Sequence, residues 1–126
     1  MEFVQHKPIY LQIAESLCDR ILSGEWKEEE RIPSVRELGV TFGVNPNTIM
    51  RTYESLEREN IIFNKRGIGY FVSAGAVSTV RASLRKDFIE HNLPALFKSM
   101  DLLGITLGDL TELYENHEKE NIHEDR

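Results

Sequence analysis

The segment IPSVRELGVTFGVNPNTIMRTYESLE (residues 32–57) contains two short amphipathic patterns separated by a glycine. In the first pattern, Ser34 and Glu37 have the spacing of a capping box, in which each side chain bonds to the backbone N–H of the other residue. We therefore predict a helix over residues 35–42. Its inner face consists of Val35, Leu38 and Phe42.

The second pattern predicts another helix directly after a tight turn at residues 43–44. Asn45 is a favourable N-cap, and Pro46 suits the first helical position because the N–H that proline lacks would have no partner there. We expect this helix to run to about Glu59, with a buried side made of Ile49, Tyr53 and Leu56. Two helices joined by so short a turn indicate a helix-turn-helix.

Upstream of this motif, another helix is predicted from Pro8, at its first position, to Gly24, which supplies a left-handed end. The acidic residues 25–30 that follow are predicted to form a loop anchored in the core by Trp26. The helix has one apolar stripe with a period of 3.6 residues, formed by Tyr10, Ile13, Ala14, Leu17, Cys18 and Ile21.

Downstream, two short runs of branched and aromatic residues, 61–63 and 70–72, predict the strands of a hairpin. Asn60 precedes them and tolerates the left-handed conformation that ends a helix. The connection, residues 64–69, is basic and contains glycine. The order of helix, helix, turn, helix and hairpin predicts a winged helix-turn-helix.

The predicted chain organisation has two parts, and the fold class is mainly α with a small β-hairpin. Residues 8–75 form the winged helix-turn-helix, with the helix-turn-helix at about 35–59 and the wing at 61–73. Residues 76–126 form a short helical tail. Pro94 must kink or restart the helix in which it lies.

Within the tail, Gly104 interrupts the helical pattern, and Thr106 with Asp109 is predicted to cap a last helix. From Asn116 onward the residues are almost all polar, so we expect the chain to fray. The apolar faces are too extensive for one short helical pair to bury, which predicts a homodimer through residues 76–126. They include Val80, Leu84, Phe88, Leu96, Phe97, Met100, Leu107 and Leu110.

Composition limits the class of protein. A chain of 126 residues that is 40% hydrophobic can form one packed domain with a short appendage. We expect a cytoplasmic protein with no membrane partner, since no apolar run has membrane length, no signal sequence opens the chain, and the lone Cys18 fits a reducing compartment. No Ser-His-Asp set, nucleotide-binding loop or Cys/His cluster is visible, so we expect neither an enzyme nor a cofactor. His117 and His123 lie among glutamates at no standard metal-site spacing, which favours a polar tail over a metal site.

The net charge of −6 is unfavourable for a nucleic-acid partner. Residues 1–75 hold 9 Lys and Arg against 11 Asp and Glu, a net charge of −2, whereas residues 76–126 hold 6 against 10, a net charge of −4. Most of the excess negative charge therefore lies in the tail. A DNA-binding protein needs cations concentrated on one surface rather than a basic chain. The acidic balance leaves open an alternative, a winged helix that docks on another protein.

Four phrases in order, spanning almost all of residues 8–72, resemble the GntR family of bacterial regulators and, within it, the short YtrA-like group. They are PIYLQI (8–13), IPSVREL (32–38), VNPNTI (44–49) with RTY (51–53), and RGIGYFV (66–72). The resemblance implies dimeric binding to an inverted repeat in DNA, usually as a repressor, with a short tail for dimerisation and often control of a transporter operon. Gly39 and Asn60 stand where the family commonly has alanine and glycine, and both departures concern backbone geometry.

The face of the second motif helix opposite its apolar side is predicted to enter the major groove of DNA. This face presents Asn47, Thr48, Arg51 and Ser55. Asparagine can pair with adenine, arginine with guanine, and threonine can bind a phosphate or touch a thymine methyl group. Capping and surface filling are the alternatives for both Asn45 and Asn47, and the cap is the favoured role for Asn45 alone.

Cations on the neighbouring elements extend this predicted surface. Arg36 points outward beside the turn, and the resemblance makes it a DNA contact, although the residues alone also allow a solvated charge. Lys65 and Arg66 lie at the hairpin tip with Gly67, where they can reach the minor groove or form an ordinary solvated loop. Tyr10 is predicted to be core rather than contact. The complete predicted DNA-binding set is Ser34, Arg36, Asn45, Asn47, Thr48, Arg51, Lys65, Arg66 and Gly67.

Overall fold

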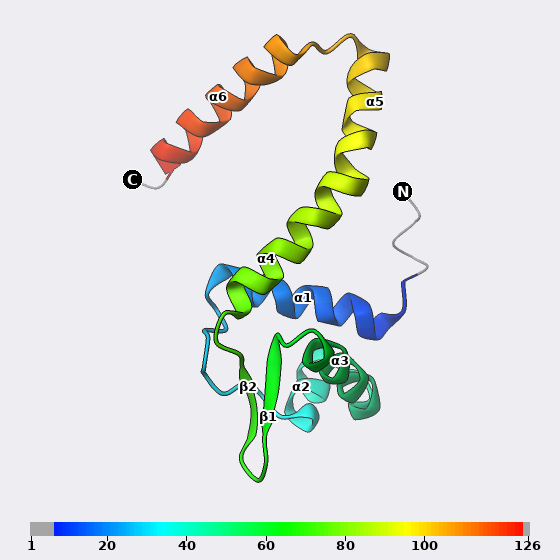
Figure 1. Ribbon diagram of the computed structural model, residues 1–126, viewed down its shortest axis with the longest axis vertical. Coiled ribbons are helices and arrows are strands. Elements are labelled where there is room, and N and C mark those ends of the chain that lie inside the picture. Colours follow the sequence, from blue (N-terminus) through cyan, green and yellow to red (C-terminus); the bar gives the residue numbers. More distant parts are fainter. Residues whose placement is uncertain (1–6, 125–126) are drawn as a thin grey trace. The chain divides into compact units, whose positions relative to one another are not determined.

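The computed structural model describes residues 7–124 of the chain (Figure 1). It divides into two compact units, one up to Leu84 and one from Arg85 onward. The described part is mainly helical, with one two-stranded antiparallel sheet. The predicted fold class is therefore confirmed. None of the helices within residues 7–124 is both long enough and apolar enough to span a membrane.

The first unit contains three helices, a hairpin and the start of a fourth helix. Its elements are α1 (Ile9–Ser23), α2 (Val35–Phe42), α3 (Pro46–Arg58), β1 (Ile62–Lys65), β2 (Gly69–Val72) and the first turns of α4 (Ala76–Asp87). Helix α3 packs against α1, α2 and β1. Side chains from all these elements meet in one core, and the largest fully buried ones include Tyr53, Leu17, Ile21, Leu38, Ile49, Leu56, Ile62, Val72 and Val80.

Helix α1 begins one residue later than the sequence predicts. Pro8 is its N-cap rather than its first helical residue, and the Pro8 carbonyl accepts a 3.1 Å hydrogen bond from the N–H of Leu11. Gly24 ends the helix in the left-handed conformation, with φ of 86°. Trp26 is 9% exposed, which confirms it as the anchor of the following loop.

Both helices of the predicted helix-turn-helix are confirmed. Helix α2 has the predicted bounds, and the capping box between Ser34 and Glu37 is present. Helix α3 begins at Pro46 with Asn45 as its N-cap and ends at Arg58, close to its expected end. The local side-chain hydrogen bonds at these helix starts explain why the sequence predicted them well.

Gly39 and Asn60, the two departures from the family pattern, both occupy positions with special backbone requirements. A Cβ atom on Gly39 would lie 3.1 Å from the carbonyl oxygen of Val44, so the missing side chain lets α2 lie close to the turn. Asn60 has φ of 62°, which is the left-handed conformation expected at the end of α3.

The wing is a hairpin with a shorter loop than the sequence predicts. Lys65 pairs with Gly69, and the N–H of Ile68 donates a 2.9 Å hydrogen bond to the Lys65 carbonyl. The loop therefore consists of residues 66–68 alone, and the prediction of a loop over 64–69 was wrong. Asn64 and Lys65 extend β1 because strand pairing does not require apolar side chains on an exposed face.

A short extended segment at residues 30–32 forms a further partner for β2, on the edge not used by β1. The N–H of Ile32 donates to the Tyr70 carbonyl at 2.9 Å, and the N–H of Val72 donates to the Glu30 carbonyl at 3.0 Å. Arg31 and Phe71 form an isolated antiparallel bridge. The end of the predicted loop 25–30 therefore belongs to the edge of the wing.

The first turns of α4 belong to the core of the first unit. Ala76 and Val80 are buried within it. The carboxylate of Glu28 accepts hydrogen bonds from the N–H groups of Gly75 and Val77, both at 2.9 Å. The compact unit thus extends to Leu84, beyond the junction after residue 75 that the sequence suggested.

In the second unit, helical structure continues through Pro94. The end of α4 is followed by a π-helix (Phe88–Asn92) and by α5 (Leu93–Leu103). Proline has no N–H to donate and its ring would clash with the carbonyl four residues earlier, so a wider π turn before it avoids a break. The predicted restart at Pro94 is confirmed, since a new α-helix begins at Leu93 with Pro94 in its first turn, and the change of helix type precedes it.

Helix α6 (Leu107–Glu124) follows Gly104, which has φ of 71°. Thr106 and Asp109 form the predicted reciprocal cap, with hydrogen bonds of 3.0 Å in both directions. The fraying predicted from Asn116 is wrong for the described residues, since the helix continues to Glu124. Glutamate and lysine are good helix formers, so an almost wholly polar sequence can remain helical there.

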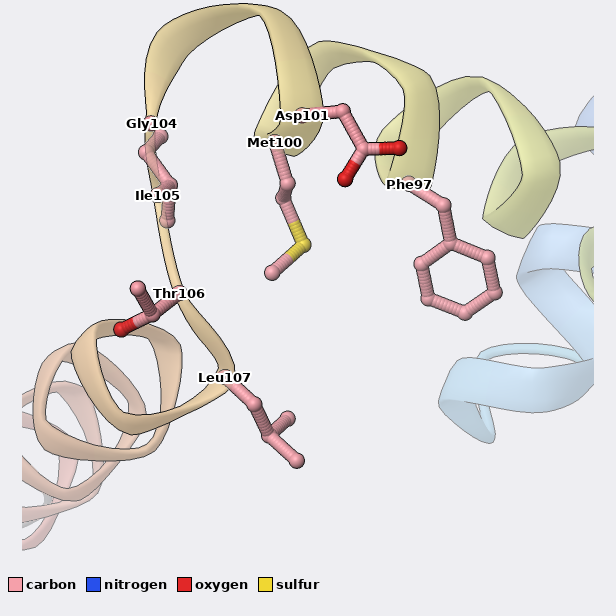
Figure 2. A pocket seen from close by; sticks show the side chains of 7 residues that line it. All are labelled: Phe97, Met100, Asp101, Gly104, Ile105, Thr106 and Leu107. Atoms are coloured by element: carbon pink, nitrogen blue, oxygen red, sulfur yellow. The ribbon is translucent and has the colours of Figure 1, made fainter.

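The connection between α5 and α6 borders an open pocket with a cavity volume of about 470 Å³ (Figure 2). Apolar side chains from both helices contribute to its lining, with a carboxylate beside them. The lining residues are Phe97, Met100, Asp101, Gly104, Ile105, Thr106 and Leu107.

Candidate nucleic-acid interface

One face of α3 is polar and exposed. Asn47 and Arg51 are exposed and Thr48 is half-buried, whereas Ile49 and Tyr53 on the other side are fully buried. The structure therefore brings together three of the four side chains that the sequence placed on this face. They lie on the first two turns of the helix, next to its N-terminus.

Ser55 is the exception, and its predicted exposure was wrong. Its side chain is only 7% exposed, and that of Thr52 is completely buried. The apolar stripe alone underestimates the buried side of α3, because α1, α2 and β1 all pack against this helix. Small polar residues can be covered when a helix has neighbours on several sides, provided that their hydroxyl groups are satisfied.

Ser34 and Arg36 lie at the N-terminus of α2, a helix that packs against α3. The Ser34 hydroxyl accepts a 3.1 Å hydrogen bond from the N–H of Glu37, and the N–H of Ser34 donates to the Glu37 carboxylate at 2.8 Å. The bond from the Ser34 N–H to the carboxylate, followed by a hydrogen bond from the Ser34 side chain, lowers the pKa of Glu37, and nearby Arg31 adds a smaller effect in the same direction. Arg36, two residues after the cap, is exposed.

At the N-terminus of α3, Asn45 is the capping residue, and its side chain also carries donors that the cap does not use. The side-chain oxygen of Asn45 accepts a 2.8 Å hydrogen bond from the N–H of Asn47, as the favoured capping interpretation requires. The amide NH₂ of Asn45 is not used in this bond and can donate elsewhere. The first N–H groups of a helix, together with its dipole, favour an anion at this end.

The tip of the wing presents the three predicted residues Lys65, Arg66 and Gly67, all exposed. The ammonium group of Lys65 lies 4.7 Å from the centre of the Phe71 ring, which supports its side chain along the strand. Gly67 has φ of 79°, a conformation that favours glycine. The predicted wing residues therefore lie close together: Arg66 and Gly67 are in the loop, and Lys65 is in the last strand pair before it.

Arg31 is a further cation at the wing that the sequence analysis missed. Its backbone pairs with Phe71, but its guanidinium reaches toward the tip. The Arg31 Nε atom would lie 3.0 Å from a Cβ atom on Gly69, so the absence of a side chain at Gly69 makes room for it. The sequence contains no local signal for this contact, because it depends on residues 30–32 pairing with a strand almost forty residues later.

The interface cations are not engaged in ion pairs with the described carboxylates. Among the side chains that the structure describes, ion pairs join Lys7 with Glu15, Arg20 with Glu25, and His91 with Asp87. Arg31, Arg36, Arg51, Lys65 and Arg66 take part in none of these, so their charge is available to an external anion.

Metal binding finds no support in the described residues. They contain no group of three or more His, Cys, Asp and Glu side chains that could hold a metal ion. The ring of His117 is 3.2 Å from the side-chain nitrogen of Asn121. The side chain of His123, the other histidine considered from the sequence, lies outside the described residues.

The arrangement of α2, a tight turn, α3 and a β-hairpin defines a winged helix-turn-helix domain. The family model described as "Bacterial regulatory proteins, gntR family" matches residues 9–72, which are the core of this domain. The chain belongs to the gntR family of DNA-binding transcription regulators.

Two relatives from Bacillus subtilis match most of both chains. The uncharacterized HTH-type transcriptional regulator YhcF is 37% identical, covering 88% of this chain and 90% of its own. The HTH-type transcriptional repressor YtrA is 36% identical, covering 83% of this chain and 80% of its own. The resemblance to the YtrA-like group therefore extends well into the tail.

Solved structures give the same assignment. A transcriptional regulator of the GntR family from Bacteroides thetaiotaomicron has a TM-score of 0.77 with 40% identity, covering 90% of this chain and 99% of that chain. The DNA-binding domain of AraR, in a crystal structure with operator ORX1, has a TM-score of 0.51 with 30% identity, covering 53% of this chain and 81% of that chain.

Proposed function

We propose that this regulator binds an inverted-repeat operator in duplex DNA as a homodimer and represses transcription. The main support is the exposed polar face of α3, where Asn47 and Arg51 project from a helix whose other side is buried. In this proposal α3 is the recognition helix and enters the major groove. Arg51 can bind guanine O6 and N7 with two N–H groups, and Asn47 can bind adenine N6 and N7.

The remaining predicted residues are assigned to the DNA backbone. Ser34 and Arg36 at the start of α2, and Asn45 and Thr48 at the start of α3, offer hydroxyl, guanidinium and amide donors to phosphates. Lys65, Arg66 and Gly67, with Arg31 added by the structure, form a cationic wing tip for the adjoining groove and its phosphates. These contacts provide most of the affinity, and the α3 side chains provide the preference for sequence.

Homodimerisation through residues 76–126 is supported by the exposed apolar surface of the second unit. Within residues 85–124, Met100 is the one hydrophobic side chain that is buried, while Phe88, Leu103, Leu107 and Leu113 are each more than half exposed. Apolar surface of this extent marks an interaction site. A twofold pair would place two recognition helices about 34 Å apart, which is one turn of DNA.

Repression is supported by the similarity to YtrA, a transcriptional repressor that matches most of the chain. The AraR domain is bound to its operator in the solved structure, which supports operator binding as the mode of action. Control of a transporter operon remains part of the proposal, since the YtrA-like resemblance implies it.

The test is selection of genomic DNA fragments by the purified full chain, followed by sequencing and gel-shift titration over a range of salt concentrations. We expect enriched fragments to share two half-sites about one DNA turn apart. Arg51→Ala should reduce affinity for the selected site by about 1–3 kcal/mol and relax the preference at one base pair in each half-site. Arg58→Ala, two turns further along α3, is the matched control and should behave like the native chain. The absence of salt-sensitive retardation at micromolar protein would contradict DNA binding and favour docking on a protein.

A further inference from the structure

We propose that Tyr10 is a positioning residue for Arg51, and that its ring presets the guanidinium for contact with a base. The inference rests on the proposed function, in which Arg51 reads the major groove. It adds a role for a residue of α1, a helix that supplies none of the proposed DNA contacts.

The geometry of the pair carries the proposal. The central carbon of the Arg51 guanidinium lies 4.3 Å from the centre of the Tyr10 ring, well within the range of a cation–π contact. Tyr10 occupies the first turn of α1 and is half-buried, whereas Arg51 is exposed on α3. The ring is therefore held by the fold while the guanidinium remains accessible from outside.

A hydrogen bond next to this contact holds the backbone of Tyr10 against α3. The hydroxyl of Thr52 lies 2.9 Å from the carbonyl oxygen of Tyr10 and 3.0 Å from that of Thr48. Thr52 is completely buried and directly follows Arg51 in the chain. The backbone of Tyr10 is thus attached to α3 one residue away from the side chain that its ring supports.

The two interactions of Arg51 use different parts of the guanidinium. A cation–π contact uses the flat face of the group, whereas its five N–H donors point outward in the plane. A guanidinium resting on Tyr10 can therefore still direct two N–H groups to guanine O6 and N7. A long, exposed arginine ordinarily loses rotamer freedom when it binds, and a side chain that is already ordered loses less.

The same contact allows an opposite effect, in which Tyr10 holds Arg51 away from DNA. The two roles differ in sign. Positioning predicts that removal of the ring weakens binding to the preferred sequence, whereas sequestration predicts that it strengthens binding. The exposure of Arg51 favours positioning, because a sequestered guanidinium would be covered.

The experiment uses the full chain and a duplex that the native protein selects from a random-sequence library. Four variants are titrated against this duplex and against a scrambled one: Tyr10→Phe, Tyr10→Leu, Arg51→Ala and the double variant Tyr10→Leu with Arg51→Ala. Tyr10→Leu should weaken binding to the selected duplex about three- to tenfold, the cost of ordering one long side chain on binding, and leave the scrambled duplex unaffected. Tyr10→Phe keeps the ring and should bind like the native chain.

The double variant separates positioning from a general structural role. If Tyr10 acts through Arg51, Tyr10→Leu should change affinity little once Arg51 is absent. Equal losses for both duplexes, additive losses in the double variant, or tighter binding by Tyr10→Leu would each overturn the proposal. Native-like base preference in Arg51→Ala would instead overturn the base contact assigned to Arg51, and this inference with it.

Discussion

The hydroxyl of Tyr53 on α3 donates a 2.6 Å hydrogen bond to the carbonyl of Pro33, in the extended residues before α2. Tyr53 is completely buried, and its ring meets that of Tyr70 on β2 edge-on, with 4.8 Å between the ring centres. Burial raises the pKa of Tyr53 well above its ordinary value, so the hydroxyl remains a donor at all physiological pH values. One side chain thus connects α3, the start of α2 and the wing.

Removal of this hydroxyl should cost stability. We expect Tyr53→Phe to lower the free energy of unfolding by about 1 kcal/mol, because it loses one hydrogen bond and leaves a partly buried carbonyl without its donor. Urea denaturation measures the change. Tyr70→Phe is the matched control, since the Tyr70 hydroxyl has only the sulfur of Met50 at 4.0 Å and its loss should change stability little. Equal stabilities of the two variants would contradict the role given to the Pro33 contact.

Glu28 should make stability depend on pH in the acid range. Its carboxylate accepts hydrogen bonds from the N–H groups of Gly75 and Val77. Both bonds lower its pKa below the ordinary value of 4.5, and the bond from Gly75 has the larger effect. Since the folded-state pKa is the lower one, this stabilisation is fully present above pH 4.5 and is lost as pH falls through the folded-state pKa. Glu28→Gln should therefore be less stable than the native chain near neutral pH, and the difference should shrink in acid.

Urea denaturation at several pH values measures this difference, with Glu30→Gln as a control that also removes one charge from the same segment. Glu37 has a pKa lowered in the same direction, so some acid-dependent loss should remain in Glu28→Gln. A gap between native chain and Glu28→Gln that stays constant with pH would show that the loss does not arise from the carboxylate bonds to Gly75 and Val77.

Local signals made much of the fold predictable. Ser34 with Glu37, Asn45 with Pro46, and Thr106 with Asp109 each specify a helix start through bonds spanning a few residues, and all three starts are confirmed. Polar residues give weaker signals for secondary structure, both in strand β1 (Asn64 and Lys65) and in the last helix after Asn116. The sequence therefore assigned too much of the wing to its loop and ended the last helix too early.

Contacts between distant segments could not be predicted in the same way. Ser55 is covered because several elements surround α3, which no period in its own sequence reveals. Arg31 reaches the wing tip only because its segment pairs with β2. Tyr10 belongs to an apolar stripe, so it was interpreted as core, and the position of Arg51 over its ring follows from the packing of α1 on α3.

The structure also determines how the role of the tail should be tested. Truncation after residue 73 would remove Ala76 and Val80 from the core of the first unit, so any loss of DNA binding could reflect unfolding. A chain ending at Leu84 retains these residues and the compact unit. We expect it to be a folded monomer by sedimentation with much weaker binding to the selected duplex, because it loses the proposed dimer contacts. A dimeric chain with full affinity would contradict dimerisation through the tail.

The wing cations should contribute affinity without contributing preference for sequence. Each phosphate contact releases condensed counterions, so the loss of one cation should reduce the slope of log affinity against log salt concentration by about 0.9. We expect Lys65→Gln and Arg31→Gln each to produce this change and to weaken binding to the selected and scrambled duplexes equally. Arg58→Gln removes the same charge from the far end of α3 and should leave the slope unchanged. If Arg31→Gln also left the slope unchanged while Lys65→Gln reduced it, the contact of Arg31 with Gly69 would be a structural feature of the wing and not part of the DNA interface.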